Sequence, residues 1–230
     1  MDLERRRKLK NRCAKEALGL IEDGMIVGLG GGGTVQCLVE LIGEKGLDIQ
    51  VVSPSFQTAS HCVARGLTVV PTWSVENVDI AFDGCDEVDR HLNALKSGGA
   101  IHTKEKIIAS MAKRYVLLVD GSKVFERLPF AHSVTIEIVP ESLGYVRKEL
   151  AKLGADVSMR TSAAKDGYTM SDHGNMIMEA KFDGVEDPKR LNRQLNEITG
   201  VVDTSLFVGK VDLVLCVDEN GTRWIQEEVK

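Results

Sequence analysis

Four carboxylates lie within seven residues in the segment AFDGCDEVD: Asp83, Asp86, Glu87 and Asp89. Carboxylates crowded in this way repel one another when ionised, so we expect at least one raised pKa, which suits proton transfer. Two other interpretations stay open. The segment could bind a divalent metal, although it lacks the glycine at the sixth position of an EF-hand loop. It could also be a solvated loop at the end of a strand.

A lysine and a further acid follow this segment. Lys96 opens the turn KSGG at 96–99, and Glu105 lies in the first turn of a helix expected over 103–113, with Thr103 as its cap. A lysine beside carboxylates and glycine backbone could stabilise a developing negative charge. Taken alone, the lysine could be solvated and Glu105 could compensate the helix dipole. We expect catalytic roles because both residues fall at the sheet edge that also carries the acidic segment.

Glycine recurs through residues 28–34, GLGGGGT, between a short apolar run and an apolar-periodic segment. Glycine lets a ligand approach the backbone closely, and the unpaired N–H groups of a helix N-terminus attract anions. The spacing Gly28-x-Gly30-x-x-Gly33 also matches a dinucleotide fingerprint, but the next strand ends in Ser-Pro-Ser at 53–55, without the required acid. We therefore expect a cradle for a phosphate or carboxylate of a small ligand. The alternative is a tight turn without a ligand.

Short apolar strands alternate with helices in the first half of the chain. We expect strands at 25–27, 49–52, 67–70, 78–82 and 115–119, and helices at 3–21, 34–43, 56–64 and 103–113. This alternation predicts an α/β fold with a mostly parallel sheet covered on both faces. Ligands bind such sheets beyond the carboxyl ends of the strands. The glycine loop, the acidic segment and the turn DGSK at 120–123 all fall at that edge, which predicts one site there.

The pattern changes near Leu128 and Pro129. We expect strands at 133–139, 156–160, 175–182 and 201–208, with helices at 141–153 and 187–198. The order β-α-β-β-α-β predicts a small α+β sandwich, the split βαβ unit of ferredoxin-like folds. Strands at 211–217 and 222–225 are expected to return to the first sheet. The predicted domains are 1–128 plus 209–230 for the larger sheet and 129–208 for the smaller unit.

Composition argues against several classes of protein. The 230 residues are 43% hydrophobic with a net charge of −5, which disfavours a nucleic-acid surface or an anionic membrane as partner. Five cysteines without a CxxC pair and five scattered histidines indicate neither a disulfide framework nor a zinc site. The charged N-terminus lacks the apolar block of a signal peptide, and no apolar run could span a bilayer. We expect a cytoplasmic protein with reduced thiols.

Seven segments in order resemble the type A ribose-5-phosphate isomerase family: VGLGGGGTV, SFQTAS, AFDGCDEVD, LKSGGAIHTKEKIIA, DGSK, SDHGN and GVVDTSLF. The resemblance extends from about Lys10 to past Phe207. It implies a Rossmann-like domain with an inserted smaller α+β domain. It also implies an isomerase of the pentose phosphate pathway that interconverts ribose 5-phosphate and ribulose 5-phosphate, uses no metal or other cofactor, and forms a homodimer or homotetramer.

The resemblance implies a role for each matching residue. Glu105 would be the base that moves a proton between C2 of the aldose and C1 of the ketose through a cis-enediolate. Lys96 would stabilise the oxyanion, Asp83 would assist ring opening, and Asp86 would orient Lys96 or bind hydroxyls. The amides of Gly98 and Gly99 would also donate to the oxyanion. The implied substrate contacts are Lys10, Gly31, Gly32, Gly33, Thr34, Asp83, Gly84, Cys85, Asp86, Lys96, Ser97, Gly98, Gly99 and Lys123.

The glycine loop differs from the GTGST usual in the family, because Gly31 and Gly33 replace two hydroxyl side chains. Each lost hydrogen bond to a charged phosphate would cost about 1.5–3 kcal/mol, so we expect weaker phosphate binding or a different ligand. KSGG stands in place of KGGG, which adds a side chain beside the reacting end, and Cys85 stands in place of alanine. All four residues with implied catalytic roles are retained.

Three other functions compete with a ribose 5-phosphate isomerase. The altered glycine loop is compatible with an isomerase of a different sugar phosphate. A non-catalytic sugar-phosphate sensor is a second alternative, since effector domains of some sugar-responsive repressors resemble this fold. The missing helix-turn-helix extension and the complete catalytic set disfavour the sensor. A dinucleotide-dependent oxidoreductase is disfavoured because the chain lacks the ribose-binding acid.

Overall fold

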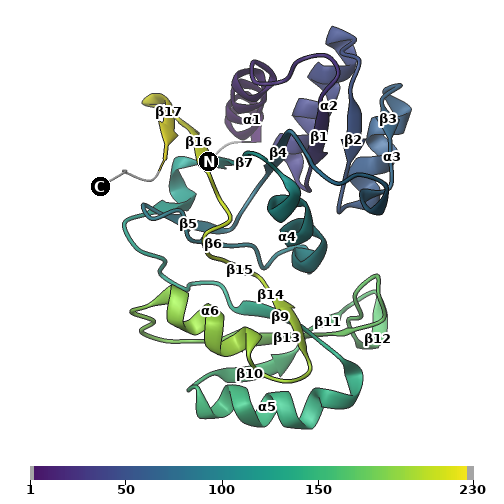
Figure 1. Cartoon of the computed structure of the whole chain (residues 1–230). Helices are drawn as coiled ribbons and strands as arrows, with labels where there is room; N and C mark the ends of the chain where they lie inside the picture. The colour runs from purple at the N-terminus through teal and green to yellow at the C-terminus, as the bar shows by residue number, and fades with distance from the viewer. Residues whose placement is uncertain (1–2, 227–230) are drawn as a thin grey trace.

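A seven-stranded sheet forms the centre of the larger of two bodies in the computed structural model, which describes residues 3–226 (Figure 1). The strand order is β17-β16-β7-β4-β1-β2-β3, and every neighbouring pair is parallel except β16 and β17. The bounds are β1 (Ile26–Leu29), β2 (Gln50–Val52), β3 (Thr68–Val69), β4 (Ile80–Asp83), β7 (Tyr115–Asp120), β16 (Leu213–Asp218) and β17 (Gly221–Ile225). The predicted parallel sheet and the return of the last two strands are confirmed.

Helices cover both faces of this sheet, as the alternating pattern predicts. The first three helices pack their apolar side chains into the core of one face, and the fourth packs on the other. Three short 3-10 helices lie in connections. The bounds are α1 (Leu3–Leu18), α2 (Gly33–Lys45), α3 (Phe56–Ala64), α4 (His102–Met111), η1 (Thr72–Ser74), η2 (Gly121–Lys123) and η3 (Pro140–Ser142).

The residues of β1 show how the two faces are filled. Val27 and Leu29 belong to the core beneath α1 and α2, and Gly28 between them faces α4. A Cβ atom at Gly28 would lie 2.6 Å from Ala81 Cβ and 2.8 Å from Ile108 Cγ2. Because glycine has no Cβ, α4 can approach the sheet closely at this point, which brings the first turn of α4 towards the strand ends.

A second sheet of four short strands lies on the same face as α4. Its order is β15-β6-β5-β8, and residues such as Val88, Ala94 and Phe207 join the core that contains α4. Strands of two or three residues are too short to show an alternating pattern, so the sequence did not predict this sheet. The bounds are β5 (Glu87–Asp89), β6 (Ala94–Leu95), β8 (Val124–Phe125) and β15 (Leu206–Phe207).

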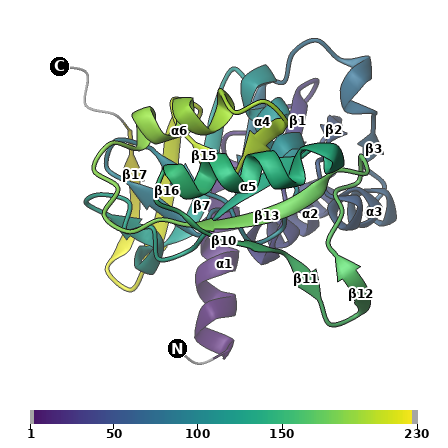
Figure 2. The same cartoon turned by 90° about the horizontal axis from the view of Figure 1, so that it is seen from below.

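The smaller body is an α+β unit inserted between β8 and β15. Its sheet has the order β10-β13-β9-β14 with every pair antiparallel, and Figure 2 shows α5 and α6 lying along it. The predicted order β-α-β-β-α-β is confirmed; an additional hairpin between β10 and β13 was not predicted. The bounds are β9 (Val134–Ile138), α5 (Leu143–Lys152), β10 (Asp156–Met159), β11 (Thr161–Ser162), β12 (Lys165–Tyr168), β13 (Met176–Lys181), α6 (Pro188–Asn196) and β14 (Val201–Thr204).

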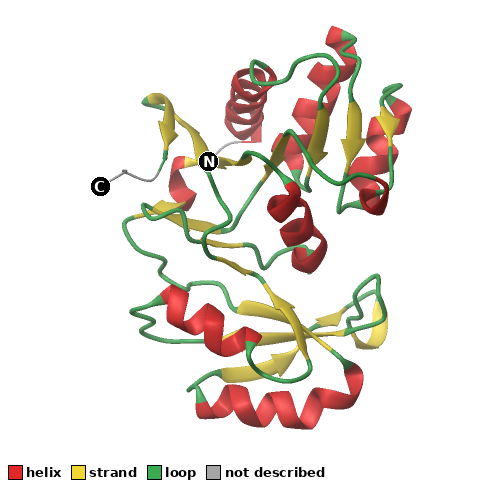
Figure 3. Ribbon diagram, viewed as in Figure 1, coloured by secondary structure: helices red, strands yellow, loops and turns green. Residues whose placement is uncertain are grey.

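The alternation VTIEI in β9 explains how this inserted unit meets the larger body. Val134, Ile136 and Ile138 pack with the buried residues of α5 and α6. Thr135 and Glu137 point to the other face, as the period of two in a strand requires, yet they are only 0% and 2% exposed. The inserted unit therefore has a buried polar face, and that face contacts the larger body. Figure 3 shows the strands of this unit lying between the larger body and the helix at the bottom of the view.

The expected single strand at 201–208 is two strands in two different sheets. The chain leaves β14 at Ser205 and continues as β15 in the second sheet. The Ser205 N–H donates to the Thr135 carbonyl at 2.7 Å, and the Ser205 carbonyl accepts from the Lys96 N–H at 2.9 Å. Ser205 thus fixes the crossing from the inserted unit to the larger body.

The two predicted side-chain caps had different outcomes. The Ser55 hydroxyl accepts from the Thr58 N–H at 3.2 Å and caps α3, as expected. The cap by Thr103 is wrong. The helix begins at His102, with Ile101 as its N-cap residue and no side-chain cap. Thr103 therefore lies inside the first turn, where its hydroxyl donates to Glu137 at 2.5 Å. One helix has the side-chain cap expected from the local sequence, and the other begins before its expected cap residue.

Candidate active site

Asp83 ends β4 at the carboxyl edge of the large sheet and is 3% exposed. Its carboxylate accepts hydrogen bonds from the Gly84 N–H at 2.7 Å and the Tyr115 hydroxyl at 3.0 Å. Gly30 lies against it on the neighbouring strand end, and a Cβ atom at position 30 would collide with the carboxyl group. Glycine at that position is therefore what allows a carboxylate to be buried here.

Lys96 connects Asp83 with Glu105. Its Nζ lies 3.1 Å from Asp83 Oδ2 and 3.3 Å from Glu105 Oε1, and it donates to the Gly84 carbonyl. Burial disfavours the charged amine, but attraction from Asp83 and then Glu105 outweighs burial and raises the pKa of Lys96. The buried ammonium ion stays charged and is placed between two acids.

Glu105 lies in the first turn of α4 and is 6% exposed. Burial, followed by repulsion from Asp83, raises the pKa of Glu105 to about 8, and the nearby Lys96 ammonium opposes this rise. A carboxylate with a raised pKa is a stronger base when it is ionised, and it can exchange protons near neutral pH. The pair of carboxylates that face each other across a lysine can therefore carry out acid–base chemistry.

Two aromatic side chains that the sequence analysis did not identify complete the buried wall. The rings of Tyr115 and Phe207 are stacked with centroids 6.2 Å apart, and Lys96 Nζ lies 5.7 Å from the Phe207 centroid. Burial and the charge of Asp83 raise the pKa of Tyr115, so its hydroxyl stays protonated and donates to Asp83. The sequence contained a signal that could have identified Tyr115, because this residue begins β7, the strand that pairs with β4. Phe207 ends the quoted segment GVVDTSLF.

A cavity of about 400 Å³ adjoins this buried group, and its lining includes Gly84 and the glycine loop at 31–34. The helix α2 begins there after Gly32, which has φ of 95° and provides no side-chain cap. A positive φ of this size is readily adopted by glycine. The first N–H groups of α2 are therefore free of a side-chain acceptor at the cavity, as an anion site requires.

Lys10 and Arg6, one helical turn apart on α1, also line the cavity. A Cβ atom at Gly33 would lie only 2.6 Å from Lys10 Nζ. The ammonium group thus occupies space that a serine side chain would need. Lys123, the last residue of η2, also lines the cavity, and its Nζ donates to the Cys85 carbonyl at 2.6 Å. The cationic side chains of Arg6, Lys10 and Lys123 therefore line the same cavity as the glycine loop, which carries no hydroxyl side chain at positions 31 and 33.

Asp86 does not contact Lys96 through an ion pair among the described residues. One of its oxygens instead accepts from the backbone N–H groups of Ser97, at 2.7 Å, and Gly98, at 3.0 Å. The Gly98 amide therefore already has an acceptor. The Ser97 hydroxyl, which we expected beside the reacting end, points away and donates to the Ser133 carbonyl at 2.5 Å. That expectation is wrong: the additional side chain anchors the turn to the inserted unit.

The four acids of AFDGCDEVD do not form the expected cluster. Glu87 accepts from the N–H and Nδ1 of His132, each at 2.8 Å, and Asp89 accepts from the Asn93 N–H at 2.9 Å. The close pair of carboxylates is Asp83 with Glu105, from two different segments. Crowding along the sequence did not predict it, because Asp83 ends β4 while Glu87 and Asp89 belong to β5 in a different sheet, and Glu105 comes from α4.

The thiol of Cys85 is buried, and burial raises its pKa to about 12, so it stays protonated and does not serve as a nucleophile. All five cysteines are free thiols. Within residues 3–226, no three His, Cys, Asp or Glu side chains are grouped so that they could hold a metal ion. In the same range no helix has the length and apolar character needed to cross a bilayer.

Comparison with known proteins gives one consistent result. The profile of the family described as ribose 5-phosphate isomerase A (phosphoriboisomerase A) matches residues 50–221. A ribose-5-phosphate isomerase A from Synechococcus is 36% identical over 94% of this chain and 95% of its own length. The solved isomerase from Methanocaldococcus jannaschii superimposes with a TM-score of 0.90 at 33% identity, covering 96% of this chain and 99% of its own. A D-ribose-5-phosphate isomerase in complex with phospho-erythronic acid gives 0.92 at 33% identity, covering 99% and 100%.

Proposed function

Since the chain belongs to the ribose 5-phosphate isomerase A family, we propose that it interconverts ribose 5-phosphate and ribulose 5-phosphate with Glu105 as the base. The observation that carries this assignment is the buried group Asp83–Lys96–Glu105 beside a cation-lined cavity. Gly84 joins the two, because it lines the cavity and its carbonyl accepts a hydrogen bond from Lys96. A phosphate in the cavity would place a sugar chain towards the acid–base group.

The reaction follows from the charges of these residues. The ionised Glu105 takes the proton from C2 of the open-chain aldose, and the C–H electron pair forms the C1–C2 double bond while the carbonyl oxygen becomes an oxyanion. The ammonium of Lys96 stabilises that oxyanion. Glu105 returns its proton to C1, and as the ketone forms at C2 the hydroxyl proton leaves O2 and is transferred to the oxyanion at O1, which becomes the C1 hydroxyl. Asp83, which accepts from Tyr115, handles the proton transfer at the sugar oxygens and in ring opening.

The anchoring end of the site is the cavity lined by the glycine loop at 31–34, Lys10 and Lys123. It can bind the phosphate of a sugar even without hydroxyl side chains at positions 31 and 33. Backbone N–H groups at the start of α2 and the ammonium groups of Lys10 and Lys123 provide donors and positive charge. Lys10 occupies the space beside Gly33. A dianionic phosphate remote from C1 and C2 also provides binding energy that orients the reacting carbons.

A direct assay tests this function. Purified protein is incubated with ribose 5-phosphate, and with a panel of other pentose and tetrose phosphates, without added metal. We expect turnover of ribose 5-phosphate and a loss of about 10³-fold in kcat in Glu105→Gln. The matched control is Glu126→Gln, an exposed carboxylate paired with Arg90, which should keep full activity. Turnover of another sugar alone would contradict the substrate, and binding without turnover would contradict the enzyme.

We also propose the finer features that the family resemblance implies. The catalytic domain comprises residues 1–128 and 209–230, and the inserted domain 129–208; the protein is a cytoplasmic homodimer or homotetramer. Five free thiols are consistent with a reducing compartment. Light scattering coupled to size exclusion tests the assembly, because a monomer at micromolar concentration would contradict it.

A further inference from the structure

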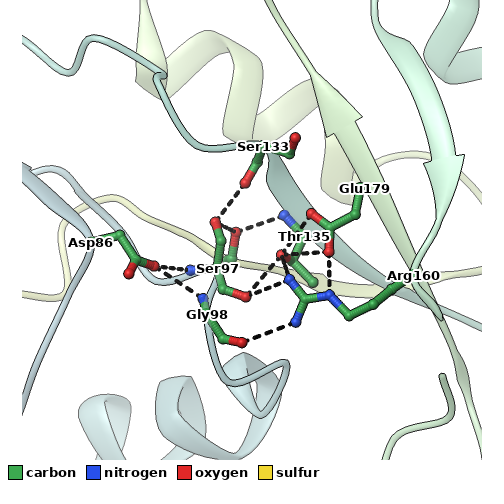
Figure 4. Close-up of polar contacts among 8 residues, drawn as sticks. Asp86, Ser97, Gly98, Ser133, Thr135, Arg160 and Glu179 are labelled. Atoms are coloured by element: carbon green, nitrogen blue, oxygen red, sulfur yellow. Dashed lines mark hydrogen bonds and ion pairs between the residues drawn. The ribbon is translucent and has the colours of Figure 1, made fainter. Parts of the chain in front are cut away.

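The buried polar face of the inserted unit contacts the turn KSGG through the guanidinium group of Arg160 and through the Thr135 hydroxyl, which donates to the Ser97 carbonyl at 3.2 Å (Figure 4). Arg160 follows β10 directly and reaches across to the larger body. Its Nη2 donates to the Ser97 carbonyl at 2.7 Å, and its Nη1 donates to the Gly98 carbonyl at 3.2 Å. Neither the motifs quoted from the sequence nor the acid–base group includes this arginine.

The guanidinium group is itself held in place from the inserted unit. Arg160 Nε donates to Glu179 Oε1, and the Thr135 hydroxyl lies 3.1 Å from Nη2 and 3.2 Å from Glu179 Oε2. The side chains of Arg160 and Glu179 are only 21% and 18% exposed. Three neighbouring strands, β9, β13 and the end of β10, therefore fix the orientation of the fork.

Asp86 holds the same turn from the other side. It accepts from the N–H groups of Ser97 and Gly98, while Arg160 donates to the carbonyls of the same two residues. In a trans peptide the C=O and the following N–H point in opposite directions. The hydrogen bond from Arg160 to the Gly98 carbonyl therefore directs the Gly99 N–H away from the guanidinium group.

We propose that Arg160 is a positioning residue for the isomerisation: it fixes the peptide planes after Lys96 and so aims the Gly99 amide at the oxyanion. This inference rests on the proposed function, in which the oxyanion forms beside Lys96. The amide of Gly99 is the donor in question because Asp86 already engages the Gly98 amide. A planar guanidinium group can donate to two adjacent carbonyls at once, whereas the ammonium group of a lysine lacks this planar arrangement of donors.

The test compares Arg160→Lys with a matched control, Arg193→Lys, an exposed arginine of α6 paired with Glu197. We expect kcat for ribose 5-phosphate to fall roughly 10- to 100-fold in Arg160→Lys, below the 10²–10³-fold loss of a deleted oxyanion donor. KM should stay within about 3-fold, because the phosphate binds at the other end of the site. Arg193→Lys should match the parent protein in both constants.

Two binding measurements separate positioning from a general loss of structure. Phospho-erythronic acid has a carboxylate in place of the reacting carbons, so its affinity should weaken by about the same factor as kcat in Arg160→Lys. Inhibition by inorganic phosphate, which probes only the anchoring end, should be unchanged. Glu179→Gln, which keeps the shape of the acceptor, should give a smaller effect in the same direction and serves if Arg160→Lys unfolds.

Nuclear magnetic resonance of the amide groups tests the inference independently of turnover. The resonances of Gly98 and Gly99 should shift in Arg160→Lys and stay unchanged in Arg193→Lys. Unshifted resonances, a kcat within 2-fold of the parent protein, or a rise in KM with unchanged kcat would each overturn the positioning role. Failure of the parent protein to convert ribose 5-phosphate would instead overturn the proposed function, and the resonances would still report whether Arg160 sets these amides.

Discussion

The two ends of the site lie at one edge of the same sheet but in different environments. At the reacting end, the side chains of Asp83, Lys96 and Glu105 are 4%, 5% and 8% exposed. At the proposed anchoring end, Lys10 is exposed, and the glycine loop at 31–34 offers backbone groups to the cavity. Burial strengthens electrostatic interactions and shifts pKa values, whereas water and salt screen exposed charges. We therefore expect substitutions at the two ends to alter chemistry and binding separately.

The largest effect is expected from Lys96→Met, which removes the positive charge that lies between the two buried carboxylates. We expect kcat to fall by about 10³-fold or more and the free energy of unfolding to fall by roughly 3–5 kcal/mol, as for a broken buried ion pair. Steady-state kinetics and urea unfolding measure the two effects. Lys113→Met, an exposed lysine paired with Asp79, is the control; equal losses in both variants would show that the effect of Lys96 does not come from its buried ion pairs.

The pH dependence should also come from the reacting end. With a pKa of about 8 for Glu105, the ionised base becomes more abundant as pH rises, so kcat/KM should increase by up to about tenfold per pH unit below that value. The measurement is kcat/KM from about pH 6 to pH 9. A flat profile across this range would show that Glu105 does not limit the reaction.

The same group gives a signed prediction for stability. The folded-state pKa of Glu105 is raised from its ordinary value of 4.5 to about 8, so the folded chain binds more protons than the unfolded chain between those values. Its contribution to the free energy of unfolding is complete below about pH 4.5 and is lost as pH rises through about 8. Glu105→Gln should therefore gain stability relative to the parent protein on going from about pH 5 to pH 9. The opposite trend in urea unfolding would exclude the assigned shift.

Alanine substitutions at the adjacent residues Gly30 and Gly31 compare the reacting end with the anchoring end directly. At Gly30 the added Cβ collides with the buried Asp83 carboxyl, whereas at Gly31 it meets no atom within 4 Å among the described residues. Gly30→Ala should lose about 1–3 kcal/mol of stability and about tenfold in kcat, through displacement of Asp83. Gly31→Ala should stay within about 0.5 kcal/mol of the parent protein. Thermal unfolding and kinetics would contradict this if the two variants behaved alike.

The smallest effect is expected at the open end. Lys10→Met should raise KM about fivefold with kcat unchanged, because an exposed cation contributes only modest, screened binding free energy. The KM of the parent protein should rise with salt, and this dependence should weaken in the variant. A fall in kcat without a change in KM would show that Lys10 contributes to the chemical step and not to phosphate binding.

The sequence predicted much of this edge because topology alone brings the ends of parallel strands together. Asp83, Lys96 and Glu105 fall at that edge from separate segments, and their ion pairs follow. Arg160 could not be predicted, since its contacts with Ser97 and Gly98 depend on how the inserted unit docks. The cap expected at Thr103 failed for a local reason, because the helix already begins at His102. Local pattern determines elements, and long-range contacts decide which polar groups meet.

Ser205 has a consequence for how the molecule moves. It is fully buried, and its backbone is hydrogen-bonded to Thr135 of the inserted unit and to Lys96, which directly follows β6. Backbone hydrogen bonds to both bodies oppose rotation about the dihedrals of this residue, so the crossing is poorly suited to act as a hinge. We therefore expect the two bodies to keep one relative orientation through the catalytic cycle, so that a sugar enters a preassembled site and only side chains rearrange around it.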